Sequence, residues 1–368
     1  MPPVYPYERL LAYKEKAKAV EGGIVDLSIG TPCDPPASMV VEALATSGAE
    51  RGYPQSVGSP RYRAAAAAWV ARRFGVQLEH SEVFACVGAK EFVTSLPHWL
   101  RLRSPERDTV LYPALSYPSY EMGATLAGCR AVPVPPDETG CLDLAAVKGA
   151  DAARALALWV NSPGNPAGQL EDLGAAAAWG REHAVPVFSD ECYVEFTWNG
   201  RPRTILEHGV DGVVALHSLS KRSNVAGLRA GFYVGDDSLT HYLSEVRKHA
   251  GLLVPGPVQF AAAVALDDDS HVELQRDFYA ERLRRFADIL VQLGAGATIP
   301  EGGFYLWAMA PNRDAWAFTE FLAAEGGCLV SPGDLYGPPG AGHVRVALVQ
   351  PRERLELVAQ RLGTPTPS

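Results

Sequence analysis

The sequence predicts an α/β protein built around a mostly parallel sheet with helices on both faces. Between residues 82 and 235, short apolar runs alternate with alanine-rich stretches of helical character. This alternation is typical of strand-helix-strand units whose strands are covered on both sides. In chain order, the candidate strands are Val83–Val87, Thr109–Tyr112, Ala131–Val134, Leu156–Val160, Val185–Ser189, Val213–His217 and Ala230–Val234.

The pattern changes after about residue 262, where a long helical stretch, Val272–Leu293, follows. An apolar run at Gly302–Met309, a further helical pattern at Trp316–Glu325 and an apolar run around Val344–Val349 come next. This change of pattern indicates a second, smaller α/β domain. A chain of 368 residues is long enough for two packed domains.

The composition argues against several classes of protein. A formal net charge of −9 disfavours a general nucleic-acid binder, which needs a basic face, and pairs such as Arg72-Arg73 and Arg284-Arg285 are expected to be solvated helix faces. The six cysteines include no Cys-x-x-Cys pair, so we expect neither a metal site nor a disulfide framework. The chain starts without a secretory signal and has no apolar run approaching about 18 residues, so we expect a cytoplasmic protein without a membrane span.

Residues with complementary chemistry follow three of the candidate strands. The segment Ser218–Arg229 reads Ser-Leu-Ser-Lys-Arg-Ser-Asn-Val-Ala-Gly-Leu-Arg and places Lys221 just after a buried strand. A lysine amine beside groups that can bind phosphate is suited to form an imine with a cofactor aldehyde. A solvated Lys-Arg pair at the start of a surface loop is the plainer alternative.

The other two segments add amide and carboxylate groups. Asn161–Gly168 must turn at its prolines and glycines, which either leaves two asparagine amides free for a ligand or makes an ordinary turn. Asp190–Tyr193 begins with a carboxylate that could hold magnesium in a nucleotide-binding protein, but the chain lacks the phosphate-binding Gly-x-x-x-x-Gly-Lys-[Ser/Thr] loop. Because ligands bind at the carboxyl ends of parallel strands, we expect these three segments to converge with Gly88.

The order and spacing of these groups resemble the active-site signature of the class I/II aminotransferases, which are pyridoxal-phosphate enzymes of fold type I. The signature residues are Asn165, Asp190, Tyr193, Ser218, Lys221 and Arg229. Further landmarks of the family lie in order at Leu27–Pro32, Tyr53–Gly58, Gly88–Glu91, Pro113–Tyr120, Gly302–Trp307, Pro332–Gly333 and His343–Arg345. The resemblance implies a large domain with a seven-stranded sheet at residues 45–262 and a small α/β domain formed by residues 1–44 and 263–368.

This resemblance assigns the catalytic roles. Lys221 would carry pyridoxal 5'-phosphate and, once released as a neutral amine, would move a proton from the substrate Cα as a general base. Asp190 would face the pyridine nitrogen and keep it protonated, which makes the ring an electron sink. A helix N-cap is the alternative role for Asp190. Tyr193 and the Asn165 amide would bind the phenolic oxygen of the ring.

The remaining cofactor contacts are also implied by the resemblance. Tyr117 would stack on the ring, although Tyr120 is close enough in sequence to compete for that role. The expected phosphate donors are Ser218, Arg229 and the backbone amides of Gly88, Ala89 and Lys90, which we expect to open a helix. Tyr53 would reach the phosphate bound by a neighbouring subunit, which implies a homodimer with shared active sites.

Binding of the substrate carboxylate is assigned to the carboxyl-terminal part of the chain. The Arg345 guanidinium can hold a carboxylate through two parallel hydrogen bonds and so fix the direction of the Cα–H bond. Gly30 would let the backbone approach the same carboxylate, with Asn165 beside it. The alternative for Arg345 is a surface salt bridge.

Three further segments are similar to those of actinobacterial-type succinyldiaminopimelate aminotransferases, namely Arg247–Gln259, Leu266–Asp269 and Ser331–Pro338. This resemblance implies amino transfer between glutamate/2-oxoglutarate and N-succinyl-LL-2,6-diaminopimelate/N-succinyl-2-amino-6-oxopimelate, in lysine biosynthesis. Lys90 and Arg222 are candidates for binding the distal end of the substrate. An aspartate, aromatic or other amino-acid aminotransferase is an alternative. A regulator domain is another, but it requires an attached DNA-binding segment, for which we expect the chain to have no room.

Overall fold

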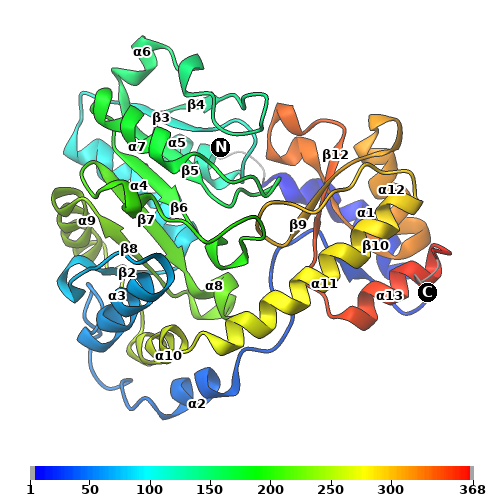
Figure 1. The fold of residues 1–368 in the computed structure, drawn as a ribbon, viewed down its shortest axis with the longest axis horizontal. Coiled ribbons are helices and arrows are strands. Elements are labelled where there is room, and N and C mark those ends of the chain that lie inside the picture. The colour runs from blue at the N-terminus through cyan, green and yellow to red at the C-terminus, as the bar shows by residue number, and fades with distance from the viewer. Residues whose placement is uncertain (1–4, 365–368) are drawn as a thin grey trace.

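A computed structural model of the protein describes residues 5–364, and its largest feature is a seven-stranded sheet (Figure 1). The strands are β2 (Phe84–Cys86), β3 (Thr109–Pro113), β4 (Arg130–Val134), β5 (Ala155–Asn161), β6 (Val187–Asp190), β7 (Val213–Ser218) and β8 (Gly231–Gly235). They lie in the order β2-β8-β7-β6-β5-β3-β4, and within this sheet only β8 runs antiparallel to its neighbours. The predicted mostly parallel seven-stranded sheet is therefore confirmed.

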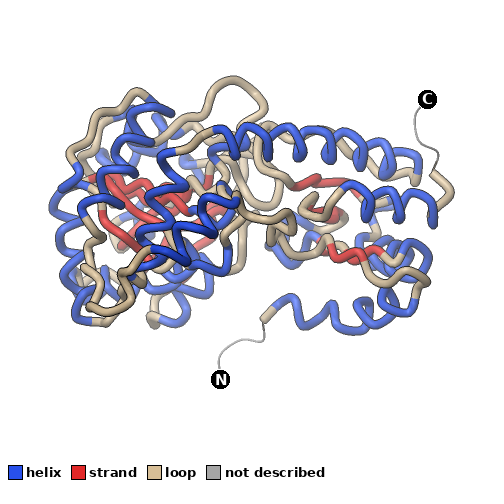
Figure 2. The backbone as a smooth tube through the Cα atoms, turned by 90° about the horizontal axis from the view of Figure 1, so that it is seen from below, coloured by secondary structure: helices blue, strands red, loops and turns tan. Residues whose placement is uncertain are grey.

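Helices cover both faces of this sheet (Figure 2). The helices of this part are α3 (Pro60–Phe74), α4 (Ala89–Arg103), α5 (Ser119–Leu126), α6 (Gly149–Ala152), α7 (Leu173–Glu182), α8 (Leu219–Arg222), α9 (Asp237–His249) and α10 (Gly256–Asp267). Along β5, Leu158 and Val160 pack into one hydrophobic core, whereas Ala157 and Trp159 pack into another. Successive side chains of a strand point to opposite faces, so a strand covered on both faces is apolar throughout.

A smaller group of elements lies beside the large sheet (Figure 1). Its strands are β1 (Val25–Asp26), paired in parallel with β10 (Cys328–Leu329), and an antiparallel sheet of β11 (Ser331–Pro332), β12 (His343–Ala347) and β9 (Tyr305–Met309). Its helices are α1 (Leu11–Ala19), α11 (Ser270–Gln292), α12 (Ala315–Gly326) and α13 (Arg352–Arg361). Leu290, Leu306, Leu322 and Val346 belong to a separate hydrophobic core in this part.

The long helix α11 runs from α10, beside the large sheet, to the smaller group of strands (Figure 1). Helix α2 (Ser38–Thr46) packs against α10, and its Val40 and Ala43 belong to a core of the large sheet. The proposed boundary at residue 44 thus falls inside a helix that packs with the large part. The division of the chain into domains stays a prediction.

Short 3₁₀ helices complete the fold, and three of them carry residues discussed below: η1 (Pro6–Leu10), η4 (Val194–Phe196) and η8 (Gly333–Tyr336). Among the helices of residues 5–364, none is long and apolar enough to cross a membrane. All six cysteines are free thiols. In the same described range, no three His, Cys, Asp or Glu side chains form a group that could hold a metal ion.

Candidate active site

A cavity of about 350 Å³ lies where the carboxyl ends of β5, β6 and β7 face the smaller group of strands. Many of the residues singled out from the sequence line it, although they are far apart along the chain. These are Gly30, Ala89, Lys90, Tyr117, Asn165, Asp190, Tyr193, Ser218, Lys221, Arg229 and Arg345. The structure thus brings the three polar segments together with Ala89 and Lys90, which belong to the turn expected to bind the cofactor phosphate (the phosphate turn, Gly88–Lys90). Arg345 of the smaller part joins them.

Lys221 lies in the one-turn helix α8, directly after β7. Ser218 caps this helix, because its Oγ accepts a hydrogen bond of 3.2 Å from the Ser220 amide. The Lys221 amine is aimed across the cavity and donates a hydrogen bond to the carbonyl oxygen of Gly30. Burial lowers the pKa of Lys221 to about 8, and the positive charges of Arg345 and Arg229 act in the same direction. A larger fraction of this amine is therefore neutral near physiological pH than for an exposed lysine.

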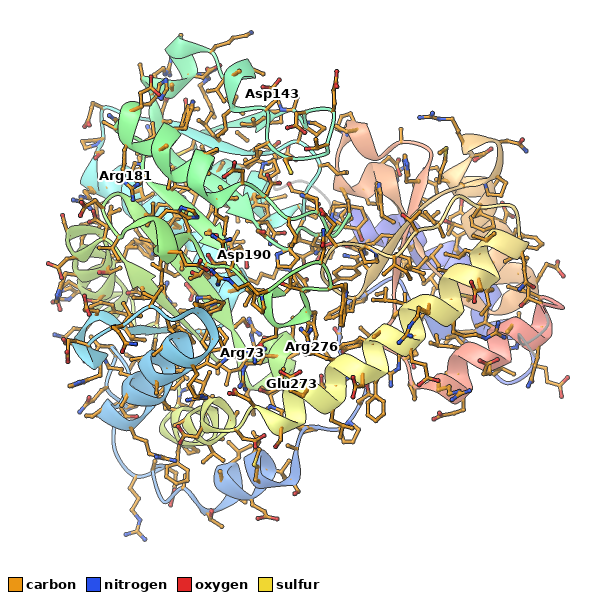
Figure 3. All side chains as sticks on the ribbon, viewed as in Figure 1. Arg73, Asp143, Arg181, Asp190, Glu273 and Arg276 are labelled. Carbon is orange, nitrogen blue, oxygen red and sulfur yellow. The ribbon has the colours of Figure 1, made fainter. Side chains whose placement is uncertain are left out.

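Asp190 is the last residue of β6, the middle strand of the large sheet (Figure 3), and it lines the cavity. Its two carboxylate oxygens accept hydrogen bonds from the Tyr120 hydroxyl (2.8 Å) and from the Cys192 amide (3.2 Å). Burial raises the pKa of Asp190 above its usual value, and both hydrogen bonds oppose that rise. The following helix η4 is preceded by Tyr193 and not by Asp190, so the N-cap alternative for this carboxylate is wrong.

Tyr120 therefore has a contact that the sequence did not assign to it. It is buried and hydrogen bonded to Asp190, whereas Tyr117 lines the same cavity from the turn before α5. In the sequence, the only sign that Tyr120 could reach the site was its position three residues after Tyr117. The structure leaves Tyr117 in a position open to the cavity, with its hydroxyl 3.1 Å from that of Tyr5.

A chain of hydrogen bonds runs from the turn after β5 to the smaller sheet. Asn161 holds the turn, because its Oδ1 accepts a hydrogen bond of 2.9 Å from the Asn165 amide. The Asn165 side-chain nitrogen lies 3.4 Å from the Tyr193 hydroxyl, which is 2.9 Å from the Tyr305 hydroxyl. Tyr305 had no assigned role in the sequence, although it stands within the landmark Gly302–Trp307.

Arg345 projects from β12 and is almost completely buried, with 2% of its surface exposed. Its Nη1 donates to Asn165 Oδ1 at 2.8 Å, and its Nη2 donates to the Ser28 carbonyl at 2.6 Å. The guanidinium carbon lies 4.3 Å from the ring centre of Tyr305 and 4.6 Å from that of Tyr336. Within the described range, no carboxylate pairs with it, so the alternative of a surface salt bridge is wrong.

The start of α4 and the Arg229 side chain form one end of the cavity. Gly88 has a φ of 75° and immediately precedes the 15-residue helix α4, as expected for a turn that opens a helix. A Cβ at Gly88 would lie only 2.2 Å from Arg229 Nη2. Free amides at a helix start, the Ser218 and Ser220 hydroxyls and a guanidinium are the donors that a phosphate group requires.

Lys90 lies in the first turn of α4, with its ammonium between two aromatic rings. Its Nζ is 3.4 Å from the hydroxyls of both Tyr5 and Tyr117, and it lies 4.9 Å from the ring centre of Tyr5. Neither contact neutralises the charge. Tyr5 and the neighbouring Tyr7 also line the cavity, a role that nothing in the sequence pattern of the amino-terminal segment predicted.

Arg222 does not line this cavity, so it cannot serve the distal end of a substrate there. It is buried and pairs with Glu195 (3.1 Å) and with Asp269 (2.8 Å). Arg73, expected on a solvated helix face, also pairs with Glu195, and it joins Glu273 of α11, near Arg276 (Figure 3). Arg285 of α11 likewise pairs with Glu356 of α13. Each of the two arginine pairs expected on solvated helix faces therefore contributes an arginine to an ion pair between two helices.

Tyr53 lies outside the cavity and is 99% exposed. Because no other side chain of its own chain packs over Tyr53, this residue has no packing role within that chain. This placement is compatible with a contact to a second subunit, and the contact itself stays a prediction.

Comparison with known proteins identifies the family of this chain. The model of the family "Aminotransferase class I and II" matches residues 23–362. The 4-dedimethylamino-4-oxo-anhydrotetracycline transaminase OxyQ of Streptomyces rimosus is 41% identical, with 98% of this chain and 99% of that protein covered. The LL-diaminopimelate aminotransferase of Desulforudis audaxviator is 36% identical over 96% of this chain and 93% of that protein.

A solved structure agrees with these relatives. The structure of a probable N-succinyldiaminopimelate aminotransferase from Thermus thermophilus superimposes with a TM-score of 0.86 at 31% identity, covering 98% of this chain and all of the other. The expected fold type and cofactor are therefore confirmed at the level of the family. The chain belongs to the class I and II aminotransferase family, whose members depend on pyridoxal 5'-phosphate.

Proposed function

We propose that this aminotransferase moves the amino group between glutamate/2-oxoglutarate and N-succinyl-LL-2,6-diaminopimelate/N-succinyl-2-amino-6-oxopimelate. The observation that carries the proposal is the charge pattern of the cavity. Four basic residues line it, Lys90, Lys221, Arg229 and Arg345, and among the described lining residues Asp190 is the only carboxylate. Such a cavity favours a phosphorylated cofactor and substrates with more than one carboxylate.

The residues of the cavity fit pyridoxal phosphate. Ser218, Arg229 and the amides at the start of α4 would hold the phosphate, and the close fit of Gly88 against Arg229 leaves no room for a side chain at that turn. Lys221 would hold the aldehyde carbon, and Asp190 the pyridine nitrogen. When bound, the cofactor supplies an electron sink for the negative charge that forms at the substrate Cα.

Lys221 is the proton carrier of the proposed reaction. As a free neutral amine, its Nζ would take a proton from the substrate Cα and would carry it to the aldehyde carbon of the cofactor, on the other side of the imine nitrogen. The buried position favours this role, because a pKa of about 8 leaves the amine partly neutral near physiological pH. Asp190 would present its negative charge to the pyridine nitrogen of the cofactor, and the Tyr120 hydroxyl and the Cys192 amide fix the orientation of this carboxylate.

Arg345 orients the substrate for this proton transfer. Its guanidinium is held against Tyr305 and Tyr336 and is tied to Asn165, so it presents a fixed pair of donors. Two parallel hydrogen bonds to the α-carboxylate set the direction of the Cα–H bond relative to Lys221. Gly30 lies beside Tyr305, and a Cβ at position 30 would be 2.0 Å from the Tyr305 hydroxyl. Only glycine therefore leaves room for the substrate carboxylate to approach the backbone here.

Lys90 is the residue proposed to bind the distal end of the substrate. With Lys221 and Arg229 engaged by the cofactor and Arg345 by the α-carboxylate, the Lys90 ammonium is the remaining positive charge that lines the described cavity. The distal end of N-succinyldiaminopimelate carries an amide and two carboxylates, which match this charge. Free LL-diaminopimelate has a distal ammonium in place of the amide, and the described lining offers no carboxylate beyond Asp190 to bind it. This difference favours the succinylated substrate over the free diamino acid.

The proposed active form is a homodimer in which Tyr53 reaches the phosphate of the partner. Its support is the full exposure of Tyr53 together with the absence of this residue from the described lining of its own cavity.

The test is an assay of amino transfer from N-succinyl-LL-2,6-diaminopimelate to 2-oxoglutarate, run beside LL-diaminopimelate, aspartate and phenylalanine. We expect the succinylated compound to give the highest kcat/KM, and Lys90→Met to lower that value by roughly tenfold through KM. Lys148→Met, a change of the same kind at an exposed position, should have no effect. Robust activity with the common amino acids, but none with the succinylated compound, would overturn the substrate assignment and support the alternatives named above.

A further inference from the structure

Two buried titratable side chains, Glu191 and His217, face each other directly behind the cavity. Glu191 Oε2 lies 3.5 Å from His217 Nε2, and their side chains are 0% and 3% exposed. Neither lines the main cavity, and neither has a role in the reaction described above. Both line a small hollow that adjoins the cavity, since Cys192 and Ser218 line both spaces.

The two side chains lack other partners at the atoms that face each other. Glu191 Oε1 accepts a hydrogen bond of 2.9 Å from the Ile205 amide, but Oε2 has no hydrogen bond within the described structure. Both ring nitrogens of His217 are likewise unpaired there, because the ring is packed against Trp69 and Phe232 with centroid separations of 5.0 Å each. An unpaired polar atom in such a place costs about 1–3 kcal/mol. One shared proton removes this cost at Glu191 Oε2 and His217 Nε2, while Nδ1, which then carries the ring's own proton, stays unpaired.

We propose that Glu191 and His217 are positioning residues that share one proton, with Glu191 kept as a neutral acid that donates to His217 Nε2. A displacement of roughly half an ångström brings the two atoms to an ordinary hydrogen-bond distance. Burial raises the pKa of Glu191 to about 8, with the charge of Asp190 adding to the rise, and lowers the pKa of His217 to about 3. The raised pKa of Glu191 and the lowered pKa of His217 both place the proton on the carboxyl group at neutral pH.

The other charged groups near the pair do not change this assignment. Glu195 and Arg222 line the same small hollow, but they are paired with each other and with Arg73 and Asp269. The Ile205 amide and the hydroxyl groups of Thr204 and Ser189 oppose the rise in the pKa of Glu191, but burial, the largest effect, outweighs them. Asp190 is therefore the charged neighbour whose negative charge is not matched by a local ion pair.

The pair is connected to the reaction through its neighbours in the chain. Glu191 directly follows Asp190, the last residue of β6, and His217 precedes Ser218 on β7, the strand that pairs with β6. An ionised Glu191 would add a second negative charge beside Asp190 in a region of low dielectric and so favour protonation of Asp190. A neutral Glu191 leaves Asp190 as the single anion at the ring nitrogen. This step rests on the proposed role of Asp190.

The first test measures the proton itself. We compare infrared spectra of the holoenzyme and its Glu191→Gln variant in H₂O and D₂O at neutral pH. The difference spectrum should contain the carbonyl stretch of a protonated carboxyl group, shifted by deuteration. A difference spectrum with only the bands of an ionised carboxylate would refute the proposal. This readout does not depend on the role of Asp190, so it separates failure of the inference from failure of the proposed function.

The second test asks whether the pair acts on the site. Glu191→Gln preserves a neutral group with a donor, so we expect kcat within about twofold of the parent and the same pH dependence of the visible absorbance of the bound cofactor. His217→Phe removes the acceptor, and we expect it to shift that pH dependence and lower kcat about tenfold at unchanged KM. His217→Gln, which restores an acceptor, should recover most of the loss. A shift in Glu191→Gln as large as in His217→Phe would overturn the proposal, and thermal unfolding of each variant shows that the fold is retained.

Discussion

Asn165 Oδ1 accepts a hydrogen bond of 2.8 Å from Arg345 Nη1, which links two residues 180 positions apart in the chain. Asn165 belongs to the turn after β5 of the large sheet, and Arg345 belongs to β12 of the small one. The same asparagine lies 3.4 Å from the Tyr193 hydroxyl. One amide side chain therefore contacts both the group proposed to bind the cofactor ring and the group proposed to bind the substrate carboxylate.

This relationship predicts the effect of Asn165→Asp. The new carboxylate would form an ion pair with Arg345 and compete with the substrate carboxylate for the same guanidinium. We expect KM for acidic substrates to rise at least about tenfold, with the affinity for a dicarboxylate inhibitor falling in parallel. Asn312→Asp adds the same charge at an exposed position and should leave both constants unchanged. An unchanged inhibitor Kd in Asn165→Asp would contradict the assignment of Arg345.

The buried amine predicts how cofactor capture depends on pH. Only the neutral form of Lys221 attacks the aldehyde, so the rate at which cofactor-free protein takes up pyridoxal phosphate should rise with pH and level off above about 8. Because folding lowers this pKa from its usual 10.5, the folded protein binds fewer protons than the unfolded chain between about 8 and 10.5. The contribution of this group to stability should therefore increase with pH across that interval. A midpoint for capture near 10.5, measured by stopped-flow absorbance, would contradict the burial argument.

A pair of glycine variants isolates the phosphate turn. Gly75 and Gly88 both have a φ of 75°, but a Cβ at Gly75 meets nothing within 4 Å, whereas one at Gly88 lies 2.2 Å from Arg229 Nη2. Alanine at Gly75, in the left-handed helical region with a ψ of 8°, should cost about 1–2 kcal/mol of stability, and alanine at Gly88, whose ψ of 159° is adopted almost only by glycine, should cost more. Only Gly88→Ala should also weaken cofactor affinity, because Arg229 must move. Equal affinities of the two variants in an equilibrium titration would argue against a phosphate site at this turn.

Subunit complementation tests the role of Tyr53. Tyr53→Phe should lower cofactor affinity through loss of a phosphate contact, and Lys221→Ala should be inactive. After subunit exchange, each mixed dimer has one site with both residues intact, so about a quarter of all sites should regain parental activity at limiting cofactor. If Tyr53 served its own chain, every site in the mixture would carry at least one defect. The activity would then stay at the level of the unmixed variants.

The large sheet was predictable because all of its strands except the edge strand β4 are buried along their whole length. Continuous apolar runs such as Leu156–Val160 leave little ambiguity when they are separated by helical stretches. The convergence of Asn165, Asp190 and Lys221 followed from the rule that parallel strands end at one edge. By contrast, β1, β10 and β11 contain two residues each, which is too short to produce a pattern. Only their pairing with distant segments defines them.

The errors at the site have a common physical origin. Arg222 follows Lys221 directly, but successive residues of a helix point about 100° apart, so its side chain enters an ion-pair cluster and not the cavity. The contact of Tyr120 with Asp190 and the entry of Tyr5 into the cavity depend on how distant segments pack. Neighbours in sequence show which groups are near the site, and tertiary packing decides which of them face it.

Lys221 follows a strand anchored in the core of the large sheet, while Arg345 sits between Val344 and Val346 in the separate core of the small one. The lysine proposed to hold the coenzyme and the arginine proposed to hold the substrate carboxylate are thus supported by different sets of packed side chains. Substitutions in the core around β12 should therefore change how Arg345 meets the carboxylate of the oxo-acid more than they change the capture of the coenzyme by Lys221.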